Sequence, residues 1–345
     1  MTLYEAEWRI DQAAEEKLTY LDLSSLNLKE LPPQIITCTH LTELDLSKNQ
    51  ISYIPGALGK LSNLAEIDLS CNQITSIPED FTQLSNLTEL NLSRNQITYI
   101  PEVLKLMLNL TRLVLHSNQI TFIPDGLGQL SNLTDLDLHY NQISSIPETL
   151  GQLSNLTELD LSCNRITYIP GVLKLLSNLT RLYLCGNQIT TLPAALGLLS
   201  NLVVLYIEGN QITSIPDAFG QLSNLRRLQL RDNQITSIPD ALGQLSNLRE
   251  LCLDRNRINS IPDALGQLSN MEWLSLGENH ITCIPDTFRK LVSLKDLHLE
   301  DNHITCIPET LGQLLMRLTS LDITKNPITK TPKTIRKIKE LKMDR

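Results

Sequence analysis

Two histidines and an aspartate have the residue types and the spacing of a metal-binding group. His116 and His139 are separated by 23 residues, and Asp137 lies two residues before the second histidine. Cys185 follows His139 by 46 residues, which is twice the spacing of the histidines. Imidazole nitrogens together with a carboxylate oxygen are ligands that Zn²⁺ and Cu²⁺ accept. The simpler interpretation is two surface histidines on a polar sheet, and we expect neither a metal nor a cofactor.

Acidic residues also recur at regular intervals, which could indicate the paired carboxylates of a glycosidase. No insertion that would build a cleft around them interrupts the pattern. We therefore interpret these acids as a solvated negative ridge that could steer a basic partner: Asp22, Glu43, Asp45, Glu66, Asp68, Glu89, Asp135, Asp137, Glu158 and Asp160.

The sequence lacks the signatures of the common nucleotide-binding and hydrolytic sites. The stretch GALGKLS, from Gly56, comes nearest to a phosphate-binding loop, but its spacing is wrong and Leu61 stands where a hydroxyl is needed. We therefore expect no enzymatic activity and no catalytic residue.

The seven cysteines occur at irregular positions, unlike a secreted disulfide framework. Cys283 and Cys306 are 23 residues apart and could come close enough to pair. In a reducing compartment we expect them to be two free, mostly buried thiols.

Charge and hydropathy limit the partners and the cellular location that the chain can have. The formal net charge is −9, which disfavours non-specific binding to nucleic acid. No apolar run approaches the roughly 18 residues needed to span a bilayer, and the start, MTLYEAEWRIDQAAEEK, carries acids where a signal peptide is basic and then apolar. We expect a cytoplasmic protein.

The elements that position all these residues follow from an internal repeat of 23 residues, which indicates a solenoid. Leu26 stands in the asparagine position of the first unit, and one inserted residue precedes the last, so the chain contains 14 units. Placed where a strand turns, such an asparagine can bond backbone groups of adjacent coils. The predicted structural ladder is Asn49, Asn72, Asn95, Asn118, Asn141, Asn164, Asn187, Asn210, Asn233, Asn256, Asn279, Asn302 and Asn326.

Each unit reads LxxLxLxxNxIxxIPxxLGxLSN. In TELDLSCN, Leu159 and Leu161 alternate with polar residues, as in a half-buried strand. A proline occupies one position in every unit, where its fixed φ ends the extended stretch and suits the first turn of a short helix. Every unit is therefore predicted to be a strand, a turn and a short helix.

This pattern resembles the leucine-rich repeat, specifically the 23-residue class found in Ras-group repeats and in the arms of Roco GTPases. The resemblance covers residues 18–333. It implies an α/β fold: a right-handed solenoid, or horseshoe, with a parallel concave sheet of about 14 strands and short convex helices.

Both ends of such an array must be covered, because a terminal repeat exposes a core face. We predict an N-terminal helical cap over residues 1–17, with three apolar side chains available to pack on the first repeat: Leu3, Tyr4 and Trp8. We predict a basic helical cap or tail over residues 334–345, with apolar side chains at helical spacing: Ile335, Ile338 and Leu341.

The outward-facing strand positions have no packing duty and are free to serve recognition. They hold 19 acidic and eight basic residues across the 14 units, which argues against nucleic acid as a partner. From the fifth unit onward these positions include Tyr, Trp and Arg, the residue types that dominate binding hot spots. An alternative is that cross-strand pairs of these residues only stabilise the sheet. The predicted partner-binding residues are Arg112, His116, His139, Tyr140, Arg181, Tyr183, Val204, Tyr206, Arg227, Gln229, Arg231 and Trp273.

We therefore predict a non-catalytic scaffold that binds a protein or peptide on its concave face, in intracellular signalling, with a partner that could carry a basic surface. Two alternatives remain open. The resemblance also allows the regulatory repeat arm of a multidomain Roco-type GTPase, whose GTPase part is absent from this chain, or the recognition domain of a bacterial effector.

Overall fold

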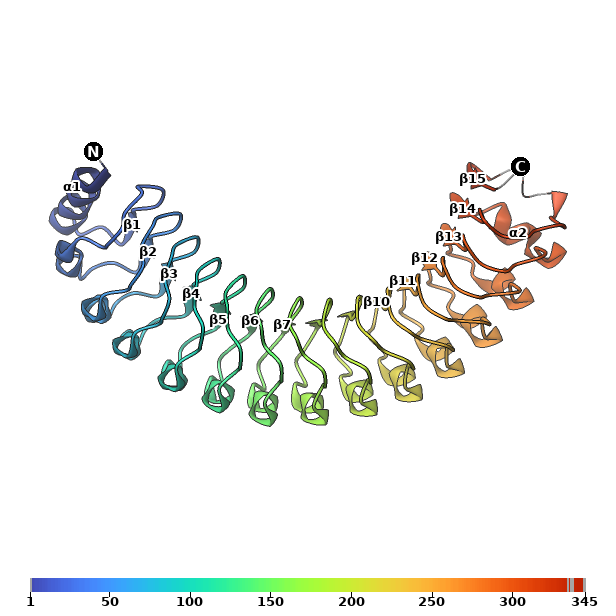
Figure 1. Cartoon of the computed structure of the whole chain (residues 1–345), viewed down its shortest axis with the longest axis horizontal. Coiled ribbons are helices and arrows are strands. Elements are labelled where there is room, and N and C mark those ends of the chain that lie inside the picture. The colour runs from blue at the N-terminus through green and yellow to red at the C-terminus, as the bar shows by residue number, and fades with distance from the viewer. Residues whose placement is uncertain (1, 334, 336–337, 344–345) are drawn as a thin grey trace. The chain divides into compact units, whose positions relative to one another are not determined.

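The computed structural model of the chain describes residues 2–333, 335 and 338–343 (Figure 1). These residues fall into two compact units, residues 1–166 and residues 167–345, which are described separately.

In the first unit, helix α1 (Thr2–Glu15) precedes a series of three-residue strands and short 3₁₀ helices. The strands are β1 (Tyr20–Asp22), β2 (Glu43–Asp45), β3 (Glu66–Asp68), β4 (Glu89–Asn91), β5 (Arg112–Val114), β6 (Asp135–Asp137) and β7 (Glu158–Asp160). The 3₁₀ helices are η1 (Pro33–Thr37), η2 (Gly56–Lys60), η3 (Glu79–Gln83), η4 (Glu102–Leu106), η5 (Asp125–Gln129) and η6 (Glu148–Gln152).

The second unit continues the same alternation and contains one short helix, α2 (Gly312–Leu315). Its strands are β8 (Arg181–Tyr183), β9 (Val204–Tyr206), β10 (Arg227–Gln229), β11 (Glu250–Cys252), β12 (Trp273–Ser275), β13 (Asp296–His298), β14 (Ser320–Asp322) and β15 (Glu340–Lys342). Its 3₁₀ helices are η7 (Gly171–Leu175), η8 (Ala194–Leu198), η9 (Asp217–Gln221), η10 (Asp240–Gln244), η11 (Asp263–Gln267), η12 (Asp286–Lys290) and η13 (Glu309–Leu311).

Within each unit the strands pair in parallel, in chain order and with no slip in register. Leu136 of β6 pairs with Leu159 of β7, and Leu205 of β9 pairs with Leu228 of β10. Figure 1 shows the strands on one side of each unit and the 3₁₀ helices on the other. The predicted solenoid of parallel strands and short helices is therefore confirmed.

The core is a column of aliphatic side chains between these two layers. Each strand points its middle residue inward, because successive side chains of a strand alternate between faces. In the sixth repeat Leu136, Leu138 and Ile143 are fully buried, as are Leu150 and Leu153 of the outer layer. The same positions are buried in the neighbouring repeats, so each coil packs on the next with nearly identical side chains.

A buried asparagine links each repeat to the one before it. The amide nitrogen of Asn95 donates to the carbonyl oxygens of Leu69 and Leu92, both at 3.0 Å, and of Ser93 at 3.2 Å. Its oxygen accepts the N–H of Ile74 at 2.9 Å. One side chain thus satisfies backbone groups of two successive repeats that would otherwise be buried without partners.

A second asparagine column, which was not predicted from sequence, lies before strands β3 to β12. Asn86 donates from its amide nitrogen to the Ser62 carbonyl oxygen at 2.9 Å, and Asn224 does the same to Ser200 at 2.9 Å. These side chains are exposed and make a single bond across 24 residues.

The prolines lie one position before the 3₁₀ helices, where they end the extended stretch. Pro124 has φ −70° and ψ 148°, and its carbonyl oxygen accepts the Leu127 N–H at 3.1 Å. The glycine of the LGxL motif allows adjacent outer turns to approach closely. A Cβ on Gly220 would lie 2.5 Å from the Ala241 carbonyl oxygen.

Helix α1 covers the first repeat with a different face from the one predicted. Ala6, Ile10 and Ala13 are buried, whereas Tyr4 and Trp8 are 79% and 59% exposed. Leu3 is also exposed. Small side chains let the helix backbone lie close to the first coil, where the Cys38 thiol donates to the Ile10 carbonyl oxygen. The prediction that Leu3, Tyr4 and Trp8 pack on the core is therefore wrong.

The C-terminal segment contains a strand where a helix was predicted. Residues 340–342 pair with β14, with Leu341 opposite Leu321. The spacing of three that suggested a helix also occurs inside every repeat, as in Leu58, Leu61 and Leu64, and so does not distinguish the two structures. Pairing satisfies edge groups of β14 that a helix would leave open. The predicted cap also includes residues 334, 336–337 and 344–345, which lie outside the described residues.

Among the described residues, no helix has both the length and the apolar character required to cross a membrane.

Replacing Asn95 by alanine is expected to lower the free energy of unfolding by about 1–3 kcal/mol, because buried backbone groups lose their partners. Replacing exposed Asn86 by alanine, which removes one surface bond, is the matched control and should cost less than about 1 kcal/mol. Urea unfolding followed by circular dichroism measures both. Equal losses would contradict the structural role given to the buried column.

Candidate protein-binding surface

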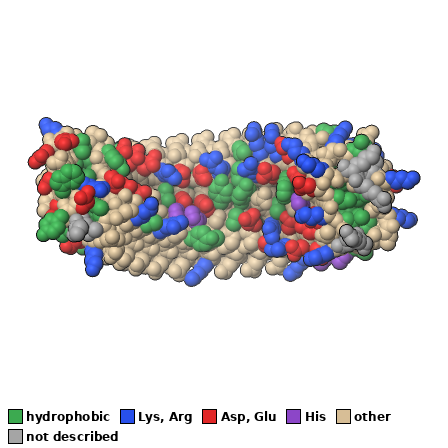
Figure 2. All heavy atoms as spheres, turned by 90° about the horizontal axis from the view of Figure 1, so that it is seen from above, with side chains coloured by type: hydrophobic (Ala, Val, Ile, Leu, Met, Phe, Trp, Pro, Cys, Tyr) green, Lys and Arg blue, Asp and Glu red, His purple; other side chains and the backbone are tan. Residues whose placement is uncertain are grey.

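The strand face is defined here as the outward side of the strands, formed by the first and third residue of each strand and by the two residues before each buried asparagine. Figure 2 shows acidic, basic and hydrophobic side chains together on the side that faces the viewer. Since the middle residue of every strand is committed to the core, chemistry on this face depends on the variable positions alone.

In the first unit, Arg112 lies between two acids on neighbouring strands. Its guanidinium is 3.9 Å from the Glu89 carboxylate and 3.6 Å from that of Asp135. All three lie at equivalent positions in the register of β4, β5 and β6. Their side chains are substantially exposed, so this ladder contributes little net stability and remains available to a partner.

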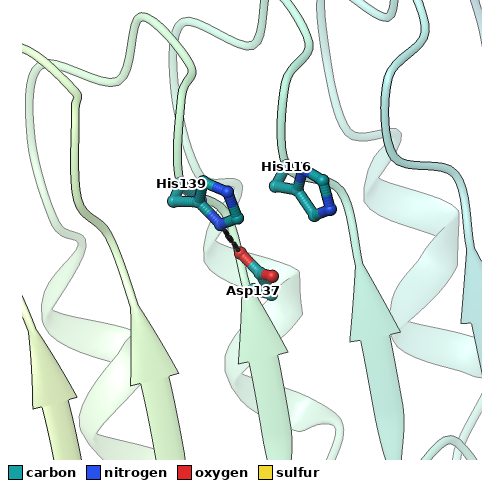
Figure 3. A group of neighbouring side chains, drawn as sticks. All are labelled: His116, Asp137 and His139. Carbon is teal, nitrogen blue, oxygen red and sulfur yellow. Dashed lines mark hydrogen bonds and ion pairs between the residues drawn. The ribbon is translucent and has the colours of Figure 1, made fainter.

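The two histidines of the first unit come together with Asp137. The rings of His116 and His139 stack with centroids 4.2 Å apart and planes 12° from parallel. His139 Nδ1 lies 2.6 Å from Asp137 Oδ1 and 3.7 Å from Asp160 Oδ2 (Figure 3). Burial lowers the pKa of His116, and burial raises the pKa of Asp160. The uncharged imidazole is therefore favoured at His116.

Tyr140 is the most exposed aromatic residue predicted for the strand face, at 60%. Its ring meets the His139 ring edge-on at 5.4 Å. The backbone of Tyr140 has φ +51°, in the left-handed region that disfavours side chains. The corresponding positions of two repeats in the second unit are glycines, Gly186 and Gly209, with φ +62° and +66°.

In the second unit, two tyrosines on adjacent strands form an aromatic pair. The rings of Tyr183 and Tyr206 lie 5.4 Å apart at 70°, an edge-to-face contact. Arg227, one strand further along, is 3.2 Å from the Glu250 carboxylate. The Glu250 charge and a hydrogen bond with the Tyr206 hydroxyl raise the Arg227 pKa. These contacts connect the two tyrosine rings and the Arg227 guanidinium into one group on the strand face.

Val204 contributes less to this face than predicted. It lies in register between Arg181 and Arg227, and the larger neighbours leave it only 9% exposed. Arg181, Arg227 and Trp273 are exposed, while Gln229 and Arg231 are half-buried.

A hollow of about 440 Å³ opens on the strand face beside Trp273. On its floor, Asp254 accepts hydrogen bonds from the Cys252 thiol at 2.7 Å and from the Ser275 hydroxyl at 2.5 Å. Asp254 was not predicted as a site residue, although it occupies the same repeat position as His116. That position holds an acid in only three repeats, as Glu208, Asp254 and Glu300, which was the available signal.

Glu300 also lines this hollow, and His298 lies against Trp273; neither was predicted from sequence. The His298 ring stacks on Trp273 with centroids 4.7 Å apart. Within the described residues, His298 Nε2 and Glu300 Oε2 are buried without a hydrogen-bond partner. Burial raises the Glu300 pKa. Nearby Asp322 is paired with Lys342 at 3.2 Å.

Cys283 and Cys306 are both free thiols. Cys306 is half-buried and Cys283 is exposed, so the prediction of two mostly buried thiols is wrong for Cys283. Cys283 follows the strand in the turn before a proline, at a position where other repeats carry exposed Tyr, Phe or Ser.

Comparison with known proteins agrees with this architecture. The pattern of the family described as Leucine rich repeat matches residues 16–70, 55–97, 108–166, 154–212, 200–258 and 246–304. A pattern described as Leucine Rich repeats (2 copies) matches residues 85–129. The chain belongs to the leucine-rich-repeat family. No protein with a curated description matches this leucine-rich-repeat chain in sequence.

Several solved leucine-rich-repeat structures are similar to the chain. The protein LIC12759 of Leptospira interrogans is 35% identical with a TM-score of 0.89, over 96% of this chain and 85% of that one. An internalin, InlF, of Listeria monocytogenes is 25% identical with a TM-score of 0.82, over 99% and 94%. The plant peptide hormone receptor RGFR1, solved in complex with RGF2, is 30% identical with a TM-score of 0.72, over 91% and 60%.

Cys252 is expected to resist alkylation in the folded protein. Burial and the adjacent Asp254 carboxylate raise its thiol pKa well above the ordinary range, so little nucleophilic thiolate forms. Treatment with iodoacetamide at pH 8, followed by mass spectrometry of the peptides, should show exposed Cys283 modified and Cys252 intact. In urea both should react. Comparable labelling of the two thiols in the folded protein would contradict the buried Cys252–Asp254 contact.

Proposed function

We propose that this leucine-rich-repeat chain is a non-catalytic binding module that holds a protein or peptide segment on the strand face of its second unit. The observation that carries the proposal is the preformed group of Tyr183, Tyr206 and Arg227 on adjacent strands. Aromatic and arginine side chains dominate the energetics of protein interfaces.

The packing of these residues favours tight binding because it reduces the entropy lost on association. The edge-to-face contact restrains both tyrosine rings, and Glu250 restrains the Arg227 guanidinium. Ordering a flexible side chain at an interface costs about 0.5–1.5 kcal/mol, so a restrained group retains more of its contact energy.

Two similar proteins support a peptide as the occupant. RGFR1 was solved in complex with RGF2, and the HAESA ectodomain of Arabidopsis, 28% identical with a TM-score of 0.73, was solved with an IDA peptide hormone. The chain spans about 60% of each of those proteins. We propose the same class of ligand here, with a preference for basic segments because acids outnumber bases on the strand face.

We also propose that the protein is cytoplasmic and acts in signalling or scaffolding. We assign its repeats to the 23-residue class found in Ras-group repeats and in the arms of Roco GTPases. The seven cysteines lie at irregular positions, unlike a secreted disulfide framework, which supports a reducing compartment. Immunoblotting of cytosolic and secreted fractions of the source cells tests this assignment, which a secreted protein would overturn.

The binding proposal is tested by selecting peptides from a displayed random library on the immobilised chain. For the selected peptides, the double variant Tyr183→Ala, Tyr206→Ala should raise Kd by roughly 30-fold, the loss of a typical hot spot. The matched control is Tyr99→Ala, Tyr168→Ala, which removes two exposed tyrosines from the turns outside the strand face. The control should leave Kd unchanged.

The alternative that the tyrosine pair only stabilises the sheet has a different signature. It predicts an unchanged Kd and a loss of about 0.2–1 kcal/mol in the free energy of unfolding. Thermal unfolding of both double variants, measured beside the binding curves, separates the two outcomes. An unchanged Kd would reject this surface as the binding site.

A further inference from the structure

We propose that His116, Asp137 and His139 form a binding site for a divalent transition-metal ion of the Zn²⁺ class. The three side chains lie together on the strand face of the first unit, with Asp137 directed toward His139 and His116 beside them (Figure 3). This inference is independent of the proposed peptide binding, which involves residues of the second unit.

The geometry brings one potential ligand atom from each residue within 4.8 Å of the others. Ligand atoms on a tetrahedral Zn²⁺ are about 3.4 Å apart, given Zn–N bonds of about 2.1 Å. The imidazole rings are stacked nearly in parallel, so binding requires them to rotate until their nitrogen lone pairs converge on the ion. The strand register fixes the backbones, since Val114 of β5 is opposite Asp137 of β6 and each histidine follows its strand by two residues.

Electrostatics favours a cation at this place. Asp137 of β6 is in register with Asp160 of β7, so two carboxylates lie on adjacent strands beside the His139 ring. Arg112 on β5 is shared between Glu89 and Asp135, whereas the Arg94 charge acts on His116 and opposes a cation there. A divalent ion would offset the Asp137 and Asp160 charges, and the Asp160 carboxylate is close enough to contribute a further oxygen.

The donor set selects the type of ion. Two imidazole nitrogens with one carboxylate oxygen suit Zn²⁺, Cu²⁺ or Ni²⁺, whereas Mg²⁺ and Ca²⁺ prefer oxygen ligands throughout. A hollow of about 300 Å³ borders His116 and Asp137 and gives the ion and its remaining water ligands a path from solvent.

Two other groups of histidines in the chain differ from the proposed site in ways that bear on metal binding. His280 and His303 stack at 5.6 Å one repeat apart, but within the described residues they form no cluster with a third potential ligand. His298, Glu300 and Asp322 do form a cluster, but Lys342 already places a cation 3.2 Å from the Asp322 carboxylate. In the group of His116, Asp137 and His139, by contrast, a third ligand is present and no described lysine or arginine forms an ion pair with Asp137.

The proposal is tested by titrating the metal-stripped full chain with Zn²⁺ at pH 7.5 in a calorimeter, with Co²⁺ absorption in the visible range as a second readout. We expect one high-affinity ion per chain. His116→Gln, Asp137→Asn and His139→Gln should each weaken binding at least roughly tenfold and reduce the Co²⁺ absorption. Circular dichroism confirms that each variant is folded.

The matched controls are the double variant His280→Gln, His303→Gln and the single variant His298→Gln, both expected to bind as the wild type does. Absence of Zn²⁺ binding by the wild type would overturn the proposal. So would retention of binding in His139→Gln with loss in His298→Gln, which would assign the ion to the other cluster. Equal weakening in the His280, His303 control would show only non-specific binding to surface histidines.

Discussion

The amide of each buried asparagine binds backbone groups of two successive repeats, and the rest of the structure depends on this contact. A strand of three residues leaves carbonyl and N–H groups at its end that no neighbouring strand can pair. Asn72, for example, donates to Leu46 in the preceding repeat and to Leu69 in its own, and accepts from Ile51. The same contacts hold in the last repeat, where one inserted residue lengthens the separations by one: Asn326 donates to Leu299, 27 positions before it, and accepts from Ile304, 22 positions before it. The asparagine is therefore placed by its backbone partners, and the leucine columns and the strand register stay aligned with it.

This constraint separates the scaffold from recognition within each repeat. The asparagine, proline and leucine positions are committed to packing, so substitutions there change stability. The side chains at the outward strand positions do not pack in the core, so they can be substituted while the fold stays intact. Tyr183 and Tyr206 occupy the same position in neighbouring repeats where most earlier repeats carry aspartate, and the strands there pair in the same register.

Sequence predicted the repeating part of the structure well because its periodicity records the packing. The strands, the parallel register and the short outer helices all follow from positions such as Leu136, Pro124 and Asn141. The structure of the two terminal segments was harder to predict, because the 23-residue period stops there and the composition is compatible with more than one secondary structure. Small Ala6 and Ala13 pack where Trp8 was expected, and Leu341 belongs to a strand.

Within the candidate surface, sequence located the variable positions but not how their side chains combine. It placed His116 and His139 together because they share a column, and it missed the contact of His298 with Trp273, which joins different columns of neighbouring repeats. The shielding of Val204 by larger neighbours likewise depends on side-chain conformation, which a single sequence does not encode locally.

The bonds of the asparagine columns join residues only about one repeat apart, at separations of 21 to 26 positions for Asn95 and 24 for Asn86. Contacts of this kind make folding a local process, since a coil needs only its neighbour to form. Refolding can thus nucleate at several places and spread, and a damaged repeat can open without melting distant ones. Cooperativity in this protein is set by the strength of each junction between neighbouring coils.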